Sequence, residues 1–197
     1  MPSMTRGERR ACQSAPWRLF ARRVVLPWAL AGDVPAGRVL EIGGGSGAMA
    51  AELLERHPDI TMVVTDFDDA MVEGATRRLR VYGQRAEVRQ ADATALPFED
   101  ASFDTVVSFI MLHHTVEWEK ALAETTRVLR PGGKLIGYDL LRAQPMTAVH
   151  HDHGDGHHRF MELDALRRVL SDLPLRDTSA RRSLGGLLVR FRAEHSI

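Results

Sequence analysis

The stretch Val39-Leu40-Glu41-Ile42-Gly43-Gly44-Gly45-Ser46-Gly47 decides the fold of this chain. It has the pattern of a short apolar strand that carries a carboxylate near its end and turns at once into a glycine cluster. Glycine accepts positive φ and has no Cβ, so the backbone can turn sharply and let a ligand approach it closely. The stretch therefore predicts a nucleotide-type pocket. The spacing from Gly43 to Ala48 also fits the dinucleotide fingerprint, so this loop alone does not distinguish nicotinamide from other adenosyl cofactors.

Two predicted strands after the glycine loop each end at an acidic residue. Thr61 to Thr65 is rich in β-forming residues and runs into Asp66. A carboxylate at the tip of a second strand can accept hydrogen bonds from both hydroxyls of a ribose. Val88 to Ala93 is interpreted as a third strand that ends in Asp92. The order of loop and acids favours a nucleoside ligand.

The rest of the chain continues to alternate strand and helix patterns. Phe103 to Phe109 predicts a fourth strand, and the helix after it stops where Pro131 to Gly133 breaks the pattern. A fifth strand follows from Lys134 to Asp139. Such alternation predicts a parallel sheet with helices on both faces. The last expected elements are a helix and two antiparallel strands, at Leu163–Leu170, Leu175–Arg182 and Leu187–Arg192.

The N-terminal part of the chain has no motif of its own. Pro16 to Leu30 places apolar residues at near-helical spacing, interrupted by Pro27, and is expected to pack on the sheet or cover the cofactor mouth. Trp17 and Trp28 in this segment leave a homodimer contact open. The first 23 residues hold six arginines and one acid, Glu8. A solvated helix face or a frayed terminus is favoured over a basic arm for an anionic acceptor.

Several motifs together resemble the class I S-adenosylmethionine (SAM) methyltransferases, in the methyltransferase-11-like subgroup. They are E-x-G-x-G-x-G from Glu41, F-D-x-V-x-x from Phe103 and R-V-L-R-P-G-G-K-L from Arg127, and the close resemblance covers residues 36–142. It implies a three-layer, doubly wound α/β fold of Rossmann-like methyltransferase type, whose seven-stranded, mostly parallel sheet ends in an antiparallel hairpin. We expect a single domain over 1–197, made of a helical cap (1–35), a cofactor-binding core (36–142), a histidine-rich loop (143–160) and a terminal helix and hairpin (161–197).

The resemblance also implies SAM as the cofactor and a set of residues that hold it. Glu41 is expected to orient the loop or the methionyl amine, Asp66 to bind the ribose and Asp92 to receive the adenine amino group. Phe67 and Met71 are placed to sandwich the adenine, with ordinary core packing as the alternative. The expected cofactor-binding residues are Glu41, Gly43, Gly44, Gly45, Gly47, Asp66, Phe67, Met71, Asp92, Ala93 and Ser108.

A histidine pair marks the acceptor side. Ile110 to His114 follows the fourth strand, at the carboxyl edge where open α/β sheets keep their sites. A histidine there can remove a proton from a hydroxyl, because its ordinary pKa of about 6.5 lies near working pH. In the small-molecule and sugar O-methyltransferases that the chain resembles, such a pair and an acid after strand five face the acceptor together. Carried over, this makes His113 or His114 the general base and Asp139 a second base, an orienter or a ligand of the acceptor hydroxyl. One ring could instead pack against the cofactor.

A second histidine cluster, from His150 to His158, holds five of the nine histidines. It is expected in a loop that can reach the acceptor, as a polar lid, as a source of a catalytic or binding histidine such as His150 or His151, or as a divalent metal site. The lid is favoured. A metal is not, because the glycines make the loop flexible and the spacing matches no defined template.

These features predict an enzyme that moves a methyl group from SAM to a hydroxyl of a small acceptor, a sugar or a sugar-bearing metabolite, by base-assisted in-line transfer. The alternatives are N- or C-methylation of another small metabolite, a quinone among them, which would need a different base or none. A SAM-binding regulatory protein without activity is a further alternative. The intact glycine loop, both cofactor acids and a candidate base argue against a loss of enzymatic activity.

Composition narrows the expected partners. The 26 basic and 26 acidic residues balance, so no global field favours nucleic acid. No apolar run is long enough to span a bilayer, and the N-terminus lacks the apolar core of a secretory leader. The single cysteine, Cys12, suits a reducing cytoplasm. We expect a cytoplasmic protein with a small hydroxylated acceptor and with neither nucleic acid nor membrane as a partner.

Overall fold

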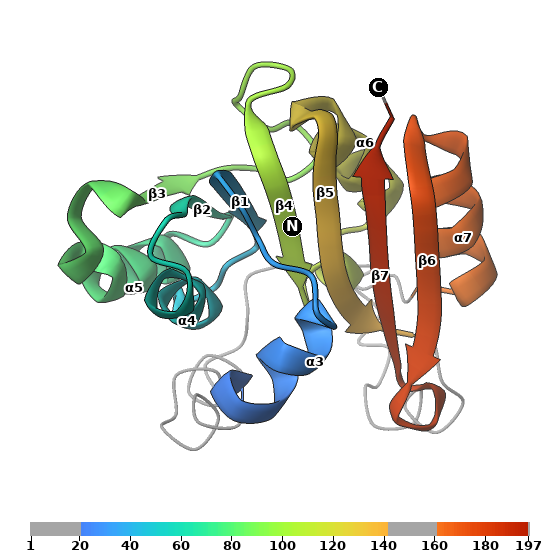
Figure 1. Cartoon of the computed structure of the whole chain (residues 1–197), viewed down its shortest axis with the longest axis horizontal. Helices are drawn as coiled ribbons and strands as arrows, with labels where there is room; N and C mark the ends of the chain where they lie inside the picture. Colours follow the sequence, from blue (N-terminus) through green and yellow to red (C-terminus); the bar gives the residue numbers. More distant parts are fainter. Residues whose placement is uncertain (1–20, 142–160, 197) are drawn as a thin grey trace.

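The computed structural model describes residues 21–141 and 161–196. Their strands form one seven-stranded sheet in the order β3-β2-β1-β4-β5-β7-β6 (Figure 1). Neighbouring strands from β3 to β5 pair in parallel, whereas β7 is antiparallel to both β5 and β6. This confirms the fold expected from the sequence. The strands are β1 (Arg38–Ile42), β2 (Thr61–Asp66), β3 (Ala86–Gln90), β4 (Phe103–Phe109), β5 (Leu129–Leu140), β6 (Leu175–Ser183) and β7 (Leu188–His195).

Helices cover both faces of the sheet and give it three layers. Helices α3, α4 and α5 pack on one face, and α6 and α7 pack on the other (Figure 1). Side chains of successive strand residues alternate between the two cores, so Val106 of β4 enters the core with α6 while Val107 enters the core with α4. The helical elements are η1 (Ala21–Val25), α3 (Leu26–Leu30), α4 (Ala48–Arg56), α5 (Asp69–Leu79), η2 (Arg80–Arg85), η3 (Leu112–His114), α6 (Trp118–Val128), α7 (Leu163–Asp172) and η5 (Leu184–Gly186).

Several element boundaries differ from the sequence prediction; α7 ends at Asp172 and β7 at His195, later than expected. Pro27 does not interrupt a helix but lies in the first turn of α3, where a missing N–H is tolerated. Strand β3 ends at Gln90, so Asp92 lies in the following turn. Strand β5 begins at Leu129 rather than Lys134, because Leu129 pairs with Phe103 before the register shifts. The proline–glycine turn that ends α6 is therefore part of the strand ladder.

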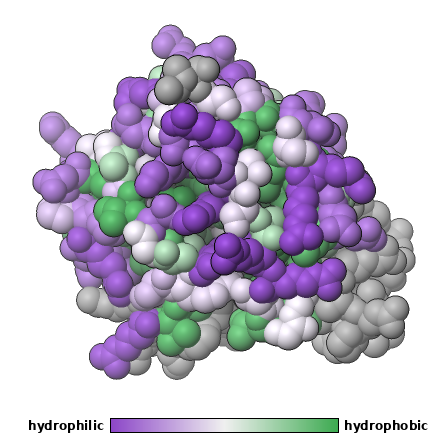
Figure 2. All heavy atoms as spheres, turned by 45° about the vertical axis from the view of Figure 1, so that its right-hand side comes forward, coloured by the Kyte–Doolittle hydropathy of each residue, from purple (hydrophilic) through white to green (hydrophobic). Residues whose placement is uncertain are grey.

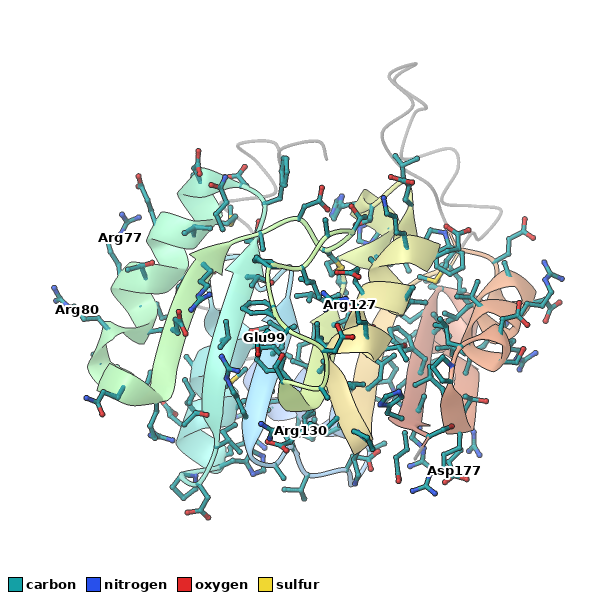
Figure 3. All side chains as sticks on the ribbon, turned by 90° about the horizontal axis from the view of Figure 1, so that it is seen from above. Arg77, Arg80, Glu99, Arg127, Arg130 and Asp177 are labelled. Carbon is teal, nitrogen blue, oxygen red and sulfur yellow. The ribbon has the colours of Figure 1, made fainter. Side chains whose placement is uncertain are left out.

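The connection from β3 to β4 contains no helix, and Arg127 of α6 makes several of the hydrogen bonds that hold it. Its guanidinium donates to the carbonyl oxygens of Leu96 (3.0 Å) and Phe98 (2.8 Å) and to the carboxylates of Asp100 (2.7 Å) and Glu124 (2.8 Å). Figure 3, seen from above, shows Arg127 beside Glu99 of this connection. The hydrogen bonds and ion pairs of Arg127 thus hold the chain in place at the amino ends of the central strands. The candidate site lies at the carboxyl ends of these strands.

Candidate functional site

The glycine loop after β1 turns through positive φ and is packed on one side only. Gly43 has φ 61°, and a Cβ there would lie 2.5 Å from Cβ of Met111. Gly44 is confined in the same way, since its Cβ would lie 2.3 Å from Cγ1 of Val64. Gly45 has φ 54°, yet no heavy atom of the described residues beyond its chain neighbours lies within 4 Å of the Cβ position. The loop is therefore fixed from beneath by side chains and open above Gly45, where a ligand can approach the backbone.

Asp66, at the end of β2, fixes the tip of this loop. Its Oδ2 accepts the N–H of Gly45 at 2.8 Å, and its Oδ1 accepts the N–H of Asp68 at 3.0 Å. Burial raises the pKa of the Asp66 carboxyl, and the N–H groups of Asp68 and Gly45 oppose that rise. Asp66 thus lies beside the open position above Gly45, where the sequence predicts a ribose ligand.

Glu41 lies beneath the loop as a buried acid with unused hydrogen-bonding capacity. The residue is 2% exposed, and its Oε2 has no hydrogen-bond partner among the described residues. Burial, and then the neighbouring charge of Asp66, raise the pKa of Glu41 to about 8. A buried carboxyl oxygen without a partner is rare in folded proteins and indicates a missing donor. A ligand with a positively charged amine and sulfonium fits this position.

The other expected cofactor residues lie in unequal surroundings. Phe67 is 42% exposed, whereas Met71 on α5 is only 1% exposed, so the two do not present matching walls. Oδ1 of Asp92 accepts the N–H and the hydroxyl of Thr94, both at 2.8 Å. Ala93 is buried in the core beneath that turn. Ser108 on β4 is fully buried, and its hydroxyl has no hydrogen-bond partner among the described residues.

The histidine and the acid on the acceptor side form one buried pair. Nδ1 of His113 lies 2.6 Å from Oδ1 of Asp139. An ionised carboxylate can only accept, so Nδ1 carries the proton and donates it, which leaves Nε2 as the basic nitrogen. Asp139 is 0% exposed and also accepts the N–H groups of Met111 (3.0 Å), Leu112 (2.7 Å) and Leu140 (2.7 Å). Asp139 is therefore shielded from solvent and occupied on both oxygens.

The backbone that carries His113 is strained at Ile110. This residue has φ 51°, a conformation that is an outlier for a β-branched side chain. Its N–H donates to the carbonyl oxygen of Tyr138 at 2.9 Å, so the turn is tied to β5. Strained backbone held by surrounding contacts is concentrated at functional sites. Sequence reasoning missed Ile110 as a positioning residue, and the only signal available was its place between a strand and the histidine pair.

The remaining predicted residues are placed in part. The ring of His114 lies against that of His113, with centroids 3.9 Å apart, and is half-buried. His150 and His151 lie outside the described residues. Within 21–141 and 161–196, no group of three or more His, Cys, Asp or Glu side chains is arranged to hold a metal ion. No helix in the same ranges has the length and apolar character needed to cross a membrane.

Known proteins share both the sequence and the fold of this chain. A family model described as a methyltransferase domain matches residues 39–133. A demethylmenaquinone methyltransferase of Renibacterium salmoninarum is 31% identical over 188 residues, which cover 82% of this chain and 76% of that protein. The chain belongs to the class I SAM-dependent methyltransferases. The methyltransferase therefore uses SAM, as the sequence predicts, and Glu41 and the open loop fit that cofactor.

Two further comparisons bear on the acceptor and on the fold. A ubiquinone/menaquinone biosynthesis C-methyltransferase of Desulfotalea psychrophila is 36% identical over 127 residues and covers 64% of this methyltransferase. The chain spans about half the length of that relative, 48%. A crystal structure of a Pyrococcus horikoshii OT3 protein has a TM-score of 0.73 at 20% identity and covers 93% of both chains. That likeness shows a shared fold.

The predicted O-methylation of a sugar hydroxyl is wrong. The relatives of this methyltransferase are named for demethylmenaquinone and for C-methylation, which favours the alternative of methyl transfer to a carbon of a quinone-type acceptor. The error has a chemical cause. A histidine paired with an acid indicates that a hydroxyl proton is removed, but it does not indicate which atom of the acceptor then takes the methyl group.

Proposed function

We propose that this methyltransferase moves the methyl group of SAM to a ring carbon of a hydroxylated aromatic acceptor of the quinone-precursor class. Relatives named for demethylmenaquinone methylation and for C-methylation support the acceptor class. The buried His113–Asp139 pair at the end of β4 is the structural observation that carries the proposal. It is the described group best suited to take a proton from the acceptor.

The chain's own residues have separate tasks in this reaction. Glu41 and Asp66 hold the cofactor from beneath and beside the glycine loop. Asp139 is a positioning residue, since it has no exposed surface and fixes the Nδ1 tautomer of His113 together with the turn around it. His113 is the base, and its Nε2 accepts the proton of a ring hydroxyl. The ring of His114 contacts that of His113 at an interplanar angle of 42°.

Removal of the hydroxyl proton makes the acceptor ring nucleophilic. The negative charge of the phenolate spreads onto the neighbouring ring carbon, which then bonds to the methyl carbon as the methyl–sulfur bond breaks. The same carbon loses its hydrogen as a proton to solvent, the ring regains aromaticity, and protonated His113 returns its proton to the ring oxygen. SAM supplies a methyl group that is already activated, and holding the two reactants in line can contribute about 7 to 11 kcal/mol in favourable cases.

The proposal is tested with a short-chain naphthoquinol and SAM labelled in its methyl group. After reaction, the mixture is reoxidised and the quinone fraction is collected. A C-methylated quinol reoxidises to a labelled quinone, whereas an O-methyl ether blocks reoxidation and leaves the label in the phenol fraction. We expect the label in the quinone fraction.

A variant with His113→Asn serves as the matched control, because asparagine can donate to Asp139 but cannot act as the base. Label in the ether fraction, or transfer to a sugar hydroxyl with the quinol untouched, would contradict the proposal. Bound SAM, measured by calorimetry on the same preparation, shows that a negative result does not come from loss of the cofactor site.

A further inference from the structure

Strands β7 and β6 present a face that no described helix covers. Helices α3, α4 and α5 lie over β1, β2, β4 and β5 on this side, and the ribbons of β7 and β6 stand open in front (Figure 1). Residues of β7 alternate strictly. Val189, Phe191 and Ala193 enter the core with α6 and α7, whereas Arg190 and Arg192 lie on the open face. This half of the sheet is therefore built with one apolar and one cationic face.

A groove runs along the open face. One hollow of about 240 Å³ lies between the end of α3 and Arg181, Arg190 and Arg192. A second of about 500 Å³ continues from it past Lys134 and is also lined by Asp177 and Glu194, of which Glu194 is paired with Arg176, so the excess of positive charge lies at the α3 end. The two share Asp33, Ser179, Arg181 and Arg192, so they form one elongated depression, here called the β6–β7 groove. Figure 2, with this side turned forward, shows hydrophilic residues gathered over it.

The hollow next to α3 carries cationic charge that the described residues do not balance. Asp33 is its only acid and already binds Lys134 (3.4 Å) and Arg192 (3.3 Å). Arg190 donates to the carbonyl oxygen of Trp28 at 2.9 Å. The side chain of Arg181 makes no hydrogen bond or ion pair with any described residue. The ladder nevertheless places Arg181 directly opposite Arg190, and like charges at such positions destabilise a sheet.

We propose that the β6–β7 groove binds an extended acidic segment of a partner protein. Alternate residues of a strand lie about 6.8 Å apart, so Arg190 and Arg192 match carboxylates at alternate positions of an extended chain. Guanidinium groups bind carboxylates in forked pairs. The elongated shape of the groove fits an extended chain better than a compact ion. The first 23 residues of this chain, with six arginines and one acid, have the wrong charge to occupy it.

The groove leads away from the methyl-transfer site. Arg190 pairs with Tyr138 and Glu194 pairs with Lys134, so the depression extends toward the amino end of β5, while Asp139 lies near the opposite end. A partner bound there leaves the cofactor loop open. The proposed docking therefore stands independently of the reaction proposed above.

The test measures fluorescence anisotropy of a labelled peptide of alternating glutamate and threonine, against a matched peptide of alternating glutamine and threonine. We expect the acidic peptide alone to bind, with affinity that falls as salt is added. Arg181→Glu should weaken binding roughly tenfold. Arg182→Glu is the matched control, because Arg182 is the next residue of β6 but pairs with Val189, which enters the core with α6 and α7 on the opposite face of the sheet. It should change binding less than about twofold.

Three results would overturn the proposal. The acidic peptide could fail to bind the full chain at low salt. The two arginine variants could weaken binding equally, which would show general charge attraction. Inorganic pyrophosphate could displace the peptide while itself losing affinity in Arg181→Glu, which would assign the groove to a compact anion. Methyl transfer by Arg181→Glu should remain at the level of the unaltered chain, since the groove lies outside the catalytic site.

Discussion

Glu41 and Glu124, at opposite ends of the central strands, lie in opposite surroundings. At the carboxyl ends, Glu41 is buried with one oxygen unpartnered among the described residues, and burial raises its pKa to about 8. At the amino ends, Glu124 accepts from Arg127 and from the N–H of Leu96, and the bond from Arg127 lowers its pKa. The paired acid at the amino ends stabilises the fold. The acid that the protein itself leaves unpaired marks where a cationic ligand belongs.

The largest effect is expected at His113, which lies at the site end and whose Nδ1 is paired with Asp139. His113→Asn should lower turnover by roughly 10² to 10⁴, the usual contribution of a general base, with SAM affinity changed little. Steady-state rates and calorimetry on the same preparation separate the two quantities. His114→Asn is the control and should retain most of the rate. A normal rate in His113→Asn would remove the base from this pair.

A change at Arg127 tests how much the contacts at the amino ends of the central strands stabilise the fold. Arg127→Met keeps the apolar stem but removes the bonds to Leu96, Phe98, Asp100 and Glu124, and should lower the free energy of unfolding by roughly 3 kcal/mol. Denaturant unfolding measures this. Arg130→Met removes one exposed ion pair, to Asp104, and should cost less than about 1 kcal/mol. Equal losses in the two variants would show that the Arg127 network does not act as a clamp.

Asp66 tests whether the acids at the site end bind a ligand. Asp66→Ala should weaken SAM binding by about 1.5 to 3 kcal/mol, the range for hydrogen bonds to a charged group. Glu124→Gln at the other end is the matched control and should leave SAM affinity unchanged. If a folded Asp66→Ala variant bound SAM as tightly as the unaltered chain, Asp66 would not be a cofactor residue.

Glu41 tests the pH dependence of stability. Its folded pKa of about 8 lies above the ordinary value of 4.5, so the folded state keeps a proton that the unfolded state releases between these values. The stabilising contribution is therefore complete below pH 4.5 and is lost as pH rises toward 8. The melting temperature of Glu41→Gln should therefore rise relative to that of the unaltered chain as the pH rises through this interval. For a chain of this length, each kcal/mol of stability that the unaltered chain loses corresponds to about 2 to 4 °C. A constant difference between pH 5 and pH 8 would contradict the shift.

Most of the fold could be predicted because its signals are local. Glycines at fixed spacing after an apolar strand, and a proline–glycine stop after a helix, act through backbone conformation and fix where the chain turns. Element boundaries that depend on pairing between distant strands are harder to predict from the sequence. Strand β5 reaches back to Leu129 only because Phe103 lies beside it, a contact between segments 26 positions apart that no local pattern carries.

The candidate site could be predicted as a set of residues but not as a set of contacts. Position after a strand places His113 and Asp139 at the same edge, yet their 2.6 Å pairing and the three N–H groups on Asp139 are tertiary facts. The same holds for the difference between exposed Phe67 and buried Met71. The atom that receives the methyl group is a property of the acceptor, which the chain does not encode in any motif.

Strand β7 lies between β5 and β6 although it is the last strand in the chain. As the polypeptide leaves the ribosome, the edge of β5 stays unpaired until nearly fifty further residues, including α7 and β6, have been made. Open strand edges are templates for pairing with other chains, and nascent domains are exposed to that hazard while they grow. Synthesis of β7, rather than collapse of the first five strands, is therefore the step that covers the edge of β5.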